Sequence, residues 1–207
     1  MTGRFGKIGW AAAALLSAAV ALYAFHYLLP KAAAPPNIGR NPYATPWLIV
    51  HASLAGAAML LGPFQFLRGL RARLPRAHRW TGRIYVFACL TGGSAGFILA
   101  LGSTAGPVAT AGFGSLAVVW ILATTQAWRM ALARRFEDHR RWMFRSFALT
   151  FAAVTLRLYL PIAAVTGLPF LEAYRAIAFL CWVPNLIAVE LYLVRRPRIG
   201  AAEPLRA

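Results

Sequence analysis

The sequence predicts an all-α integral membrane protein whose 207 residues form one domain, a bundle of six transmembrane helices. Two observations support this fold class. The composition is 60% hydrophobic and 13% charged, with a mean hydropathy of +0.59, whereas soluble domains carry about 25% charged residues. The chain also contains six apolar runs of about 20 residues, the length that a helix needs to cross the hydrocarbon core. They are Ile8–Leu29, Pro46–Leu67, Thr81–Leu101, Phe113–Leu132, Trp142–Val165 and Tyr174–Val194.

The first two helices are separated by a proline-rich segment. The first run resembles a cleaved secretory signal, but we expect a retained helix because its apolar stretch exceeds the roughly 7–15 residues of a signal core. Residues Pro30–Thr45 contain too many prolines to be helical and should form an extended cap. Thr45-Pro46 is typical of a helix start and predicts the beginning of the second helix.

The boundaries of the later helices follow from turn residues and charges. Pro75 should break the loop before the third helix, and Gly102–Gly112 should form the turn after it. Asp138 is expected to cap the fifth helix, because its carboxylate favours the positive end of the helix dipole. Cys89 and Cys181 fall inside helices, where a thiol is ordinarily a small apolar side chain.

The distribution of basic residues predicts the orientation. Of the 22 Lys and Arg residues, 18 flank the helix ends on the side of the N-terminus, three flank the other side, and Arg157 lies within a helix. Lys and Arg concentrate on the cytoplasmic side of membrane proteins, so we expect both termini in the cytoplasm. This placement accounts for the net charge of +17, and we expect no nucleic-acid partner.

The motifs of several common enzyme classes are missing. The sequence has no Walker loop, dinucleotide glycine fingerprint, paired CxxC motif, HExxH helix or nucleophile elbow. The chain has only five acidic residues, so we expect neither a metal site built from several carboxylates nor acid–base hydrolysis. The candidate chemistry therefore rests on histidine and arginine.

Two similar segments open the third and fifth predicted helices on the cytoplasmic side. Each places a histidine before arginine and an interfacial tryptophan. Two neutral imidazoles on facing helices can supply the axial ligands of a b-type haem, and arginines can neutralise its propionates. The candidate residues for haem or an anionic headgroup are His78, His139, Arg79, Arg83, Arg140 and Arg145, and no metal beyond haem iron is predicted. The alternative is an anchoring belt, because Trp and Arg also gather at lipid headgroups.

A second candidate site lies near the opposite face. Arg157 interrupts the apolar stretch Phe147–Pro161, and an arginine at the centre of a membrane helix costs roughly 2.5–3.5 kcal/mol. His51 lies about one turn into the second helix and should share its depth. We therefore predict an outer polar pocket of His51, Arg157 and Tyr159. The alternative is that Arg157 snorkels outward or pairs with Glu172.

Four further polar residues are predicted to form an inner polar layer: Gln65, Gln126, Asn185 and Glu190. Glu190 should lie at the same depth as Arg83 and Arg145. It therefore either forms a structural ion pair with an arginine or carries protons. Such a layer can also bind a quinone headgroup or a lipid phosphate.

These motifs carry a family resemblance. His51, Gly62-Pro63-Phe64-Gln65-Phe66, His78-Arg79 with Gly82-Arg83 and Tyr85, and His139 to Ser146 with Leu156-Arg157 together resemble a bacterial family of predicted membrane proteins, domain of unknown function 2306. The resemblance covers roughly Trp47 to Glu190. It implies a multi-pass protein of the bacterial inner membrane with recurrent His and Arg motifs. The topology is also similar, more distantly, to cytochrome b561-like bundles, whose haems are held by histidines in central helices.

Three functional hypotheses remain. The first is a redox-related protein that binds haem b or a quinone among His78, His139 and their arginines. The second is a protein that binds or transports an anionic lipid or small amphiphile, with Arg157 as an internal counter-charge. The third is a non-catalytic accessory membrane subunit. The expected partners are the lipid bilayer, including anionic lipids, and either further copies of the chain or a larger membrane complex.

Overall fold

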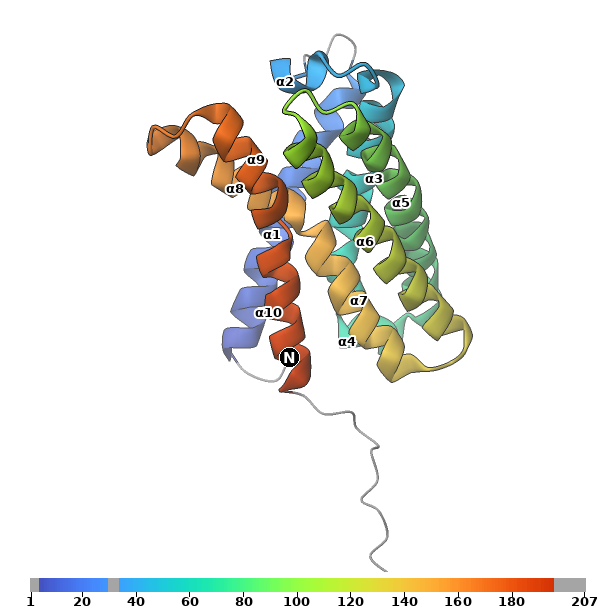
Figure 1. Ribbon diagram of the computed structural model, residues 1–207. Coiled ribbons are helices and arrows are strands. Elements are labelled where there is room, and N and C mark those ends of the chain that lie inside the picture. Colours follow the sequence, from blue (N-terminus) through green and yellow to red (C-terminus); the bar gives the residue numbers. More distant parts are fainter. Residues whose placement is uncertain (1–3, 30–33, 196–207) are drawn as a thin grey trace, which may run out of the picture.

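The computed structural model describes residues 4–29 and 34–195, and every regular element in this part of the chain is a helix (Figure 1). Six helical segments there are long and apolar enough to cross a membrane, which confirms the predicted fold class. In chain order the elements are α1 (Arg4–Phe25), η1 (His26–Leu28), α2 (Pro36–Gly39), α3 (Ala44–Gln65), α4 (Arg68–Arg73), α5 (Pro75–Leu101), α6 (Pro107–Leu132), α7 (Phe136–Thr150), α8 (Ala152–Val165), α9 (Phe170–Leu180) and α10 (Val183–Val194). Four of the charges behind the predicted orientation, Lys31, Arg196, Arg198 and Arg206, lie outside the described residues.

Three spans begin six residues before the apolar run that predicts them, at Pro75, Pro107 and Phe136 instead of Thr81, Phe113 and Trp142. Pro75 starts α5 and Pro107 starts α6, so the prediction that both prolines lie in loops is wrong. Proline at the first helical position loses no hydrogen bond, since that N–H would have no helical partner. Helix α7 starts at Phe136, which places Asp138 in its first turn instead of at the cap, 2.6 Å from the guanidinium of Arg135.

The connection between α1 and α3 is folded onto the end of the bundle. It contains the short helix α2, so the expectation of a wholly extended segment is wrong. The Asn41 side-chain amide donates to the Leu99 carbonyl at 2.7 Å, and the Thr104 hydroxyl donates to the Asn37 carbonyl at 2.9 Å. These bonds hold the connection against the end of α5 and the turn that follows. This end of the molecule is called the α2 end below.

The fifth and sixth spans are each broken near the middle, where the sequence predicts continuous helices. The fifth is divided at Phe151 into α7 and α8, and the sixth at Cys181–Trp182 into α9 and α10. Helices α8 and α9 form a hairpin that runs out to one side of the other helices (Figure 1). Both breaks adjoin the cavity described below.

Asn185 bonds to a backbone carbonyl at the end of the helix that precedes each break. Its side-chain N–H group donates to the carbonyls of Ala148 at 3.3 Å and Cys181 at 3.0 Å, and it exchanges hydrogen bonds with the Thr155 hydroxyl. The last carbonyls of a helix have no partner within the helix, and an unsatisfied carbonyl in hydrocarbon is costly. Asn185 therefore stabilises the breaks.

The centre of the bundle is packed from small residues on α3, α5 and α6. A Cβ atom at Gly92 would lie 3.2 Å from the Cβ of Leu54, and one at Gly93 would lie 2.8 Å from Ile121. Glycine at these positions lets α5 approach both neighbours closely. Cys89 is fully buried in this core and Cys181 near the second break, as apolar side chains.

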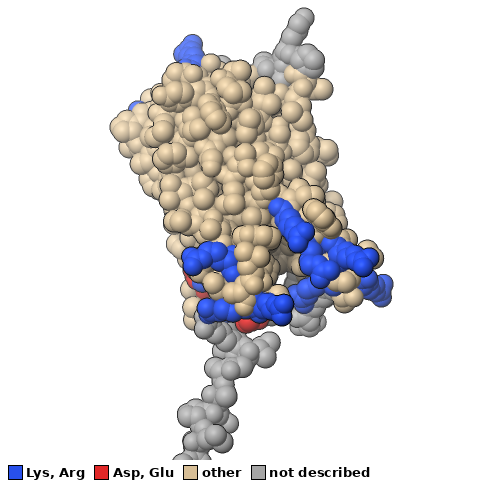
Figure 2. All heavy atoms as spheres, turned by 90° about the vertical axis from the view of Figure 1, so that its right-hand side faces the viewer, with Lys and Arg blue, Asp and Glu red and all other residues tan. Residues whose placement is uncertain are grey.

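The arginines gather at the end of the bundle opposite α2, which is called the basic end. Figure 2 shows most of the visible Lys and Arg side chains at this end and a broad surface above them that is nearly free of charge. The Arg145 guanidinium binds both carboxylate oxygens of Glu190, at 2.6 and 2.8 Å, and Arg141 donates to the Leu193 carbonyl. These contacts join the start of α7 to the end of α10.

Candidate functional site

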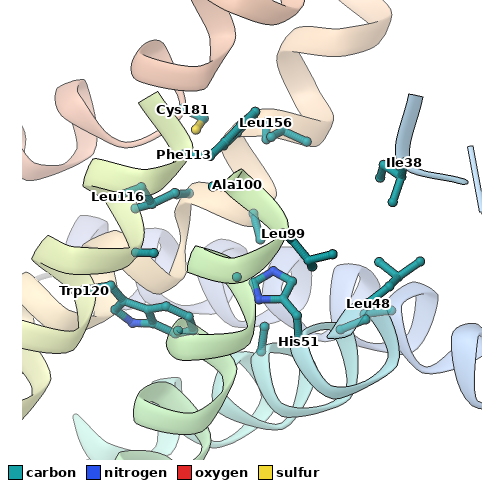
Figure 3. Close-up of a pocket in the computed structure, with 18 of the residues that line it drawn as sticks. Ile38, Leu48, His51, Leu99, Ala100, Phe113, Leu116, Trp120, Leu156 and Cys181 are labelled. Atoms are coloured by element: carbon teal, nitrogen blue, oxygen red, sulfur yellow. The ribbon is translucent and has the colours of Figure 1, made fainter. Parts of the chain in front are cut away.

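A cavity of about 240 Å³ lies between the helices in the half of the bundle toward α2. Residues from α1, α3, α5, α6, α7, α8 and α9 line it, together with the connection that contains α2. Its walls are largely apolar, and Figure 3 shows Leu99, Leu116, Trp120 and Leu156 around it, with the His51 ring among them. An apolar cavity with a few polar groups is the usual form of a small-molecule site.

His51 presents one free ring nitrogen to this cavity. Its Nδ1 atom donates to the Gly92 carbonyl of α5 at 2.8 Å, and the described residues supply no hydrogen bond to Nε2. Gly96 permits this arrangement, because a Cβ atom there would lie 2.8 Å from Nδ1. A carbonyl oxygen only accepts, so Nδ1 carries the proton and Nε2 of the neutral ring keeps its lone pair.

Arg157 lines the same cavity from α8. One terminal nitrogen donates to the Ala153 carbonyl at 3.0 Å, and the guanidinium lies 5.3 Å from the centre of the Tyr23 ring, a cation–π contact. Within residues 4–29 and 34–195, no carboxylate pairs with Arg157, and Glu172 lies exposed on α9. The guanidinium retains N–H groups that a ligand can bind.

Two further tyrosines complete the polar lining. Tyr27 in η1 and Tyr174 in α9 both border the cavity. Tyr159, which was predicted to join His51 and Arg157, instead packs with Ala152, Ala163 and neighbours between α8 and α9. Tyr23 and Tyr27 are spaced four residues apart, so they share one helical face, and this spacing was the available signal.

A chain of buried hydroxyl groups lies under the cavity floor. Trp120 and Thr150 line the cavity, and the Trp120 indole donates to the Thr150 hydroxyl at 3.0 Å. The Tyr85 hydroxyl lies 3.0 Å from those of Thr150 and Ser146, and Ser146 lies 2.7 Å from Thr124. All of these side chains are buried, and the chain joins α5, α6 and α7.

The predicted haem ligands lie in the first turns of α5 and α7, at the basic end. His139 donates from Nδ1 to the Ala127 carbonyl at 2.8 Å, which leaves Nε2 for another partner. Nδ1 of His78 is buried without a hydrogen-bond partner among the described residues. The two histidines and Arg71 are close enough to interact electrostatically, but neither histidine lines the cavity.

Most arginines of the predicted haem site have partners within the protein. Arg145 binds Glu190 and lies 4.6 Å from the centre of the Trp142 ring, and Arg140 binds Glu137 at 2.8 Å. Arg83 lies over Trp80 at 5.0 Å, and Arg79 is exposed. In the described part of the chain no three His, Cys, Asp or Glu side chains are grouped as a metal site.

The family model described as "Predicted membrane protein (DUF2306)" matches residues 48–193. The chain belongs to this family. No curated protein and no solved structure matches the sequence. The DUF2306 match includes His51, Arg157 and both histidines of the basic end, whereas α1 and Tyr27 precede it. The protein is therefore a multi-pass DUF2306 membrane protein.

The four residues of the predicted inner polar layer each bond to a different partner in this DUF2306 protein. Gln65 donates to the Thr81 hydroxyl at 2.9 Å, and Gln126 accepts from Arg129 at 3.4 Å. Asn185 binds the helix breaks, and Glu190 forms the ion pair with Arg145. In the described part of the chain these four side chains therefore form no hydrogen bond with one another.

Proposed function

We propose that this protein binds a small amphiphilic molecule within the membrane, with the polar head held by His51 and Arg157. The observation that carries the proposal is that these two side chains line one apolar cavity while Arg157 has no carboxylate partner in the described part of the chain. A cation in hydrocarbon normally faces a partner or a ligand, because its insertion is costly. A bound oxygen acceptor offsets that cost.

The cavity walls suit the remainder of such a ligand. Its lining combines leucines with small residues such as Ala52, Ala55 and Gly56, which leave room for an apolar body. Burial of apolar ligand surface supplies affinity, and the few polar groups fix the orientation of the head. The proposal therefore needs no catalytic residue.

We further infer that the basic end faces the cytoplasm of a bacterial cell and that the protein lies in the inner membrane. The gathering of arginines at that end supports this orientation. The exposed arginines there would interact with anionic lipids of the cytoplasmic leaflet, at about 1 kcal/mol for each residue near the surface.

Filling the cavity tests the proposal. Ala117 on α6 lines the cavity and is buried, so Ala117→Phe should occupy part of the space and weaken binding about tenfold or more. Binding is measured as saturable quenching of tryptophan fluorescence by 11-bromoundecanoate and, separately, by decylubiquinone. Trp120→Phe should remove most of the signal, because Trp120 borders the cavity.

Ala111→Phe is the matched control, because Ala111 lies on the exposed face of the same helix. It should leave saturable quenching unchanged. Ala24→Phe on α1 provides a second filling variant in case Ala117→Phe does not fold. Quenching that does not saturate with either probe, or that both filling variants leave unchanged in folded protein, would refute the proposal.

A second candidate is a redox function with b-type haem held by His78 and His139. The observation that favours it is the bond from His139 Nδ1 to the Ala127 carbonyl, since histidines that bind metal through Nε2 usually donate their other nitrogen in this way. Haem would supply one-electron chemistry, and the arginines nearby would bind its propionates.

An absorption spectrum tests this candidate. We expect the purified protein, expressed with ample haem, to show a b-type band in the reduced-minus-oxidised difference spectrum, and both His78→Ala and His139→Ala to lose it. His51→Ala should retain the band, because His51 lies in the other half of the bundle. Folded protein without a stoichiometric band would exclude a resident haem.

A further inference from the structure

We propose that the cavity selects a ring-shaped head that carries a hydroxyl donor as well as an oxygen acceptor, the chemistry of a hydroquinone or related phenol. This inference rests on the proposed function, which requires only that an amphiphile binds there. It goes further because the hydrogen bonds of His51 and Arg157 define what the head must offer. The two side chains make opposite demands.

His51 requires a hydrogen-bond donor on the ligand. Because its Nδ1–H is used by the Gly92 carbonyl, the neutral ring faces the cavity with the Nε2 lone pair, which accepts a hydrogen bond. Ionised carboxylates and phosphodiesters are acceptors only, so their oxygens would meet this lone pair without a proton between them. A hydroxyl group satisfies Nε2.

Arg157 requires a hydrogen-bond acceptor on the ligand. Only one of its N–H groups is used by the Ala153 carbonyl, and a guanidinium has five donors and no acceptor. A second oxygen on the same head would accept from the remaining N–H groups. A ligand that satisfies both residues therefore needs a hydroxyl hydrogen toward His51 and an oxygen lone pair toward Arg157, as the two oxygens of a hydroquinone provide.

Aromatic side chains favour a ring over a chain in this position. Trp120 and Phe113 from α6 and Tyr174 from α9 border the cavity, and Figure 3 shows Trp120 and Phe113 on the same wall. Aromatic rings pack against one another with a gain of about 0.5–1.5 kcal/mol beyond the area they bury. Gly96 lets the His51 ring lie close against α5, at the edge of this space.

A pair of matched ligands tests the inference. Under anaerobic conditions, binding of decylhydroquinone is compared with that of its dimethyl ether, which keeps the shape and the acceptor oxygens but has no hydroxyl hydrogen. We expect the hydroquinone to bind the wild type about tenfold or more tightly than the ether, because the ether leaves Nε2 unsatisfied. In His51→Phe the preference should disappear.

Further variants separate the site from general stability. His51→Gln retains a side-chain acceptor and should recover part of the preference. Arg157→Gln should weaken both ligands, whereas Arg83→Gln, at the basic end over Trp80, should change neither. Thermal unfolding of each variant identifies those that fail to fold.

The outcomes distinguish this inference from the proposed function. Equal binding of hydroquinone and ether, with both lost in folded Ala117→Phe, would overturn the hydroxyl requirement and leave the amphiphile site in place. Tighter binding of 11-bromoundecanoate than of hydroquinone would also overturn it. If no ligand saturates the wild type, the proposed function fails as well.

Discussion

Tyr85→Ala is expected to lower the free energy of unfolding by about 4 kcal/mol, because truncating a buried aromatic residue to alanine costs ~3–5 kcal/mol. Tyr85 is fully buried between α3, α5 and α7, and its ring lies against Gly62. The measurement is unfolding in mixed detergent–SDS micelles, followed by helical circular dichroism. The Tyr85→Ala substitution removes both the packing of the aromatic ring and a hydroxyl group.

The Tyr85 hydroxyl belongs to the buried chain of hydroxyl groups, and the hydrogen bonds of this chain all run in one direction. Thr150 donates to the Ser146 carbonyl, so its oxygen must accept from both Trp120 and Tyr85. Each hydroxyl has a single hydrogen, so Tyr85 donates to Thr150, Ser146 donates to Tyr85, and Thr124 donates to Ser146. Every member of the chain is then satisfied.

Tyr85→Phe separates the two contributions. It keeps the ring but leaves the Ser146 hydrogen and one Thr150 lone pair without partners, so it should cost about 1–3 kcal/mol. Tyr85→Phe must therefore be milder than Tyr85→Ala. An equal loss of stability in the two variants would mean that ring packing adds nothing, and no loss in Tyr85→Phe would mean that the chain does not stabilise the fold.

The six spans could be predicted because hydrocarbon imposes a length and a composition on each helix. Their polar ends could not be predicted in the same way, since a first turn such as Pro75 to His78 lies beyond the apolar run and leaves no hydropathy signal. This error placed His78 and His139 at or just outside the helix starts, whereas both lie in first turns.

The break in the fifth span had no local sequence signal, whereas Pro184 marks the start of α10 after the break in the sixth. Phe151 and Cys181 are ordinary residues of an apolar helix, and the breaks depend on Asn185, which is distant in sequence from the Ala148 carbonyl that it binds. Sequence alone shows a polar residue in a helix but not which carbonyl it satisfies. Tertiary contacts decide such features.

The candidate cavity was partly predictable for the same physical reason. His51 and Arg157 are conspicuous because polar side chains in hydrocarbon are costly, and counting turns from the helix ends gives both a similar depth. The structure places both on the cavity. Tyr27 and Tyr174 carry a weaker signal, because tyrosines near helix ends are also typical of the membrane interface.

Gly112→Ala is expected to lower the free energy of unfolding by about 2 kcal/mol, within the ~1–3 kcal/mol range for overpacking a close contact. A Cβ atom at Gly112 would lie 2.6 Å from the Ala178 Cβ and 2.9–3.0 Å from the Ala178 backbone. The backbone cannot move aside as a flexible side chain can, so α6 and α9 must separate. The same unfolding measurement applies.

Gly114→Ala is the control on the same helix. A Cβ atom there would lie 3.8 Å from Phe97, an ordinary contact, and alanine favours a helix over glycine by about 1 kcal/mol, so stability should hold or rise. Gly112→Ala should also weaken ligand binding, because Tyr174 on α9 and Trp120 on α6 both line the cavity. If Gly112→Ala and Gly114→Ala behave alike, the close approach of α6 and α9 neither limits stability nor shapes the cavity.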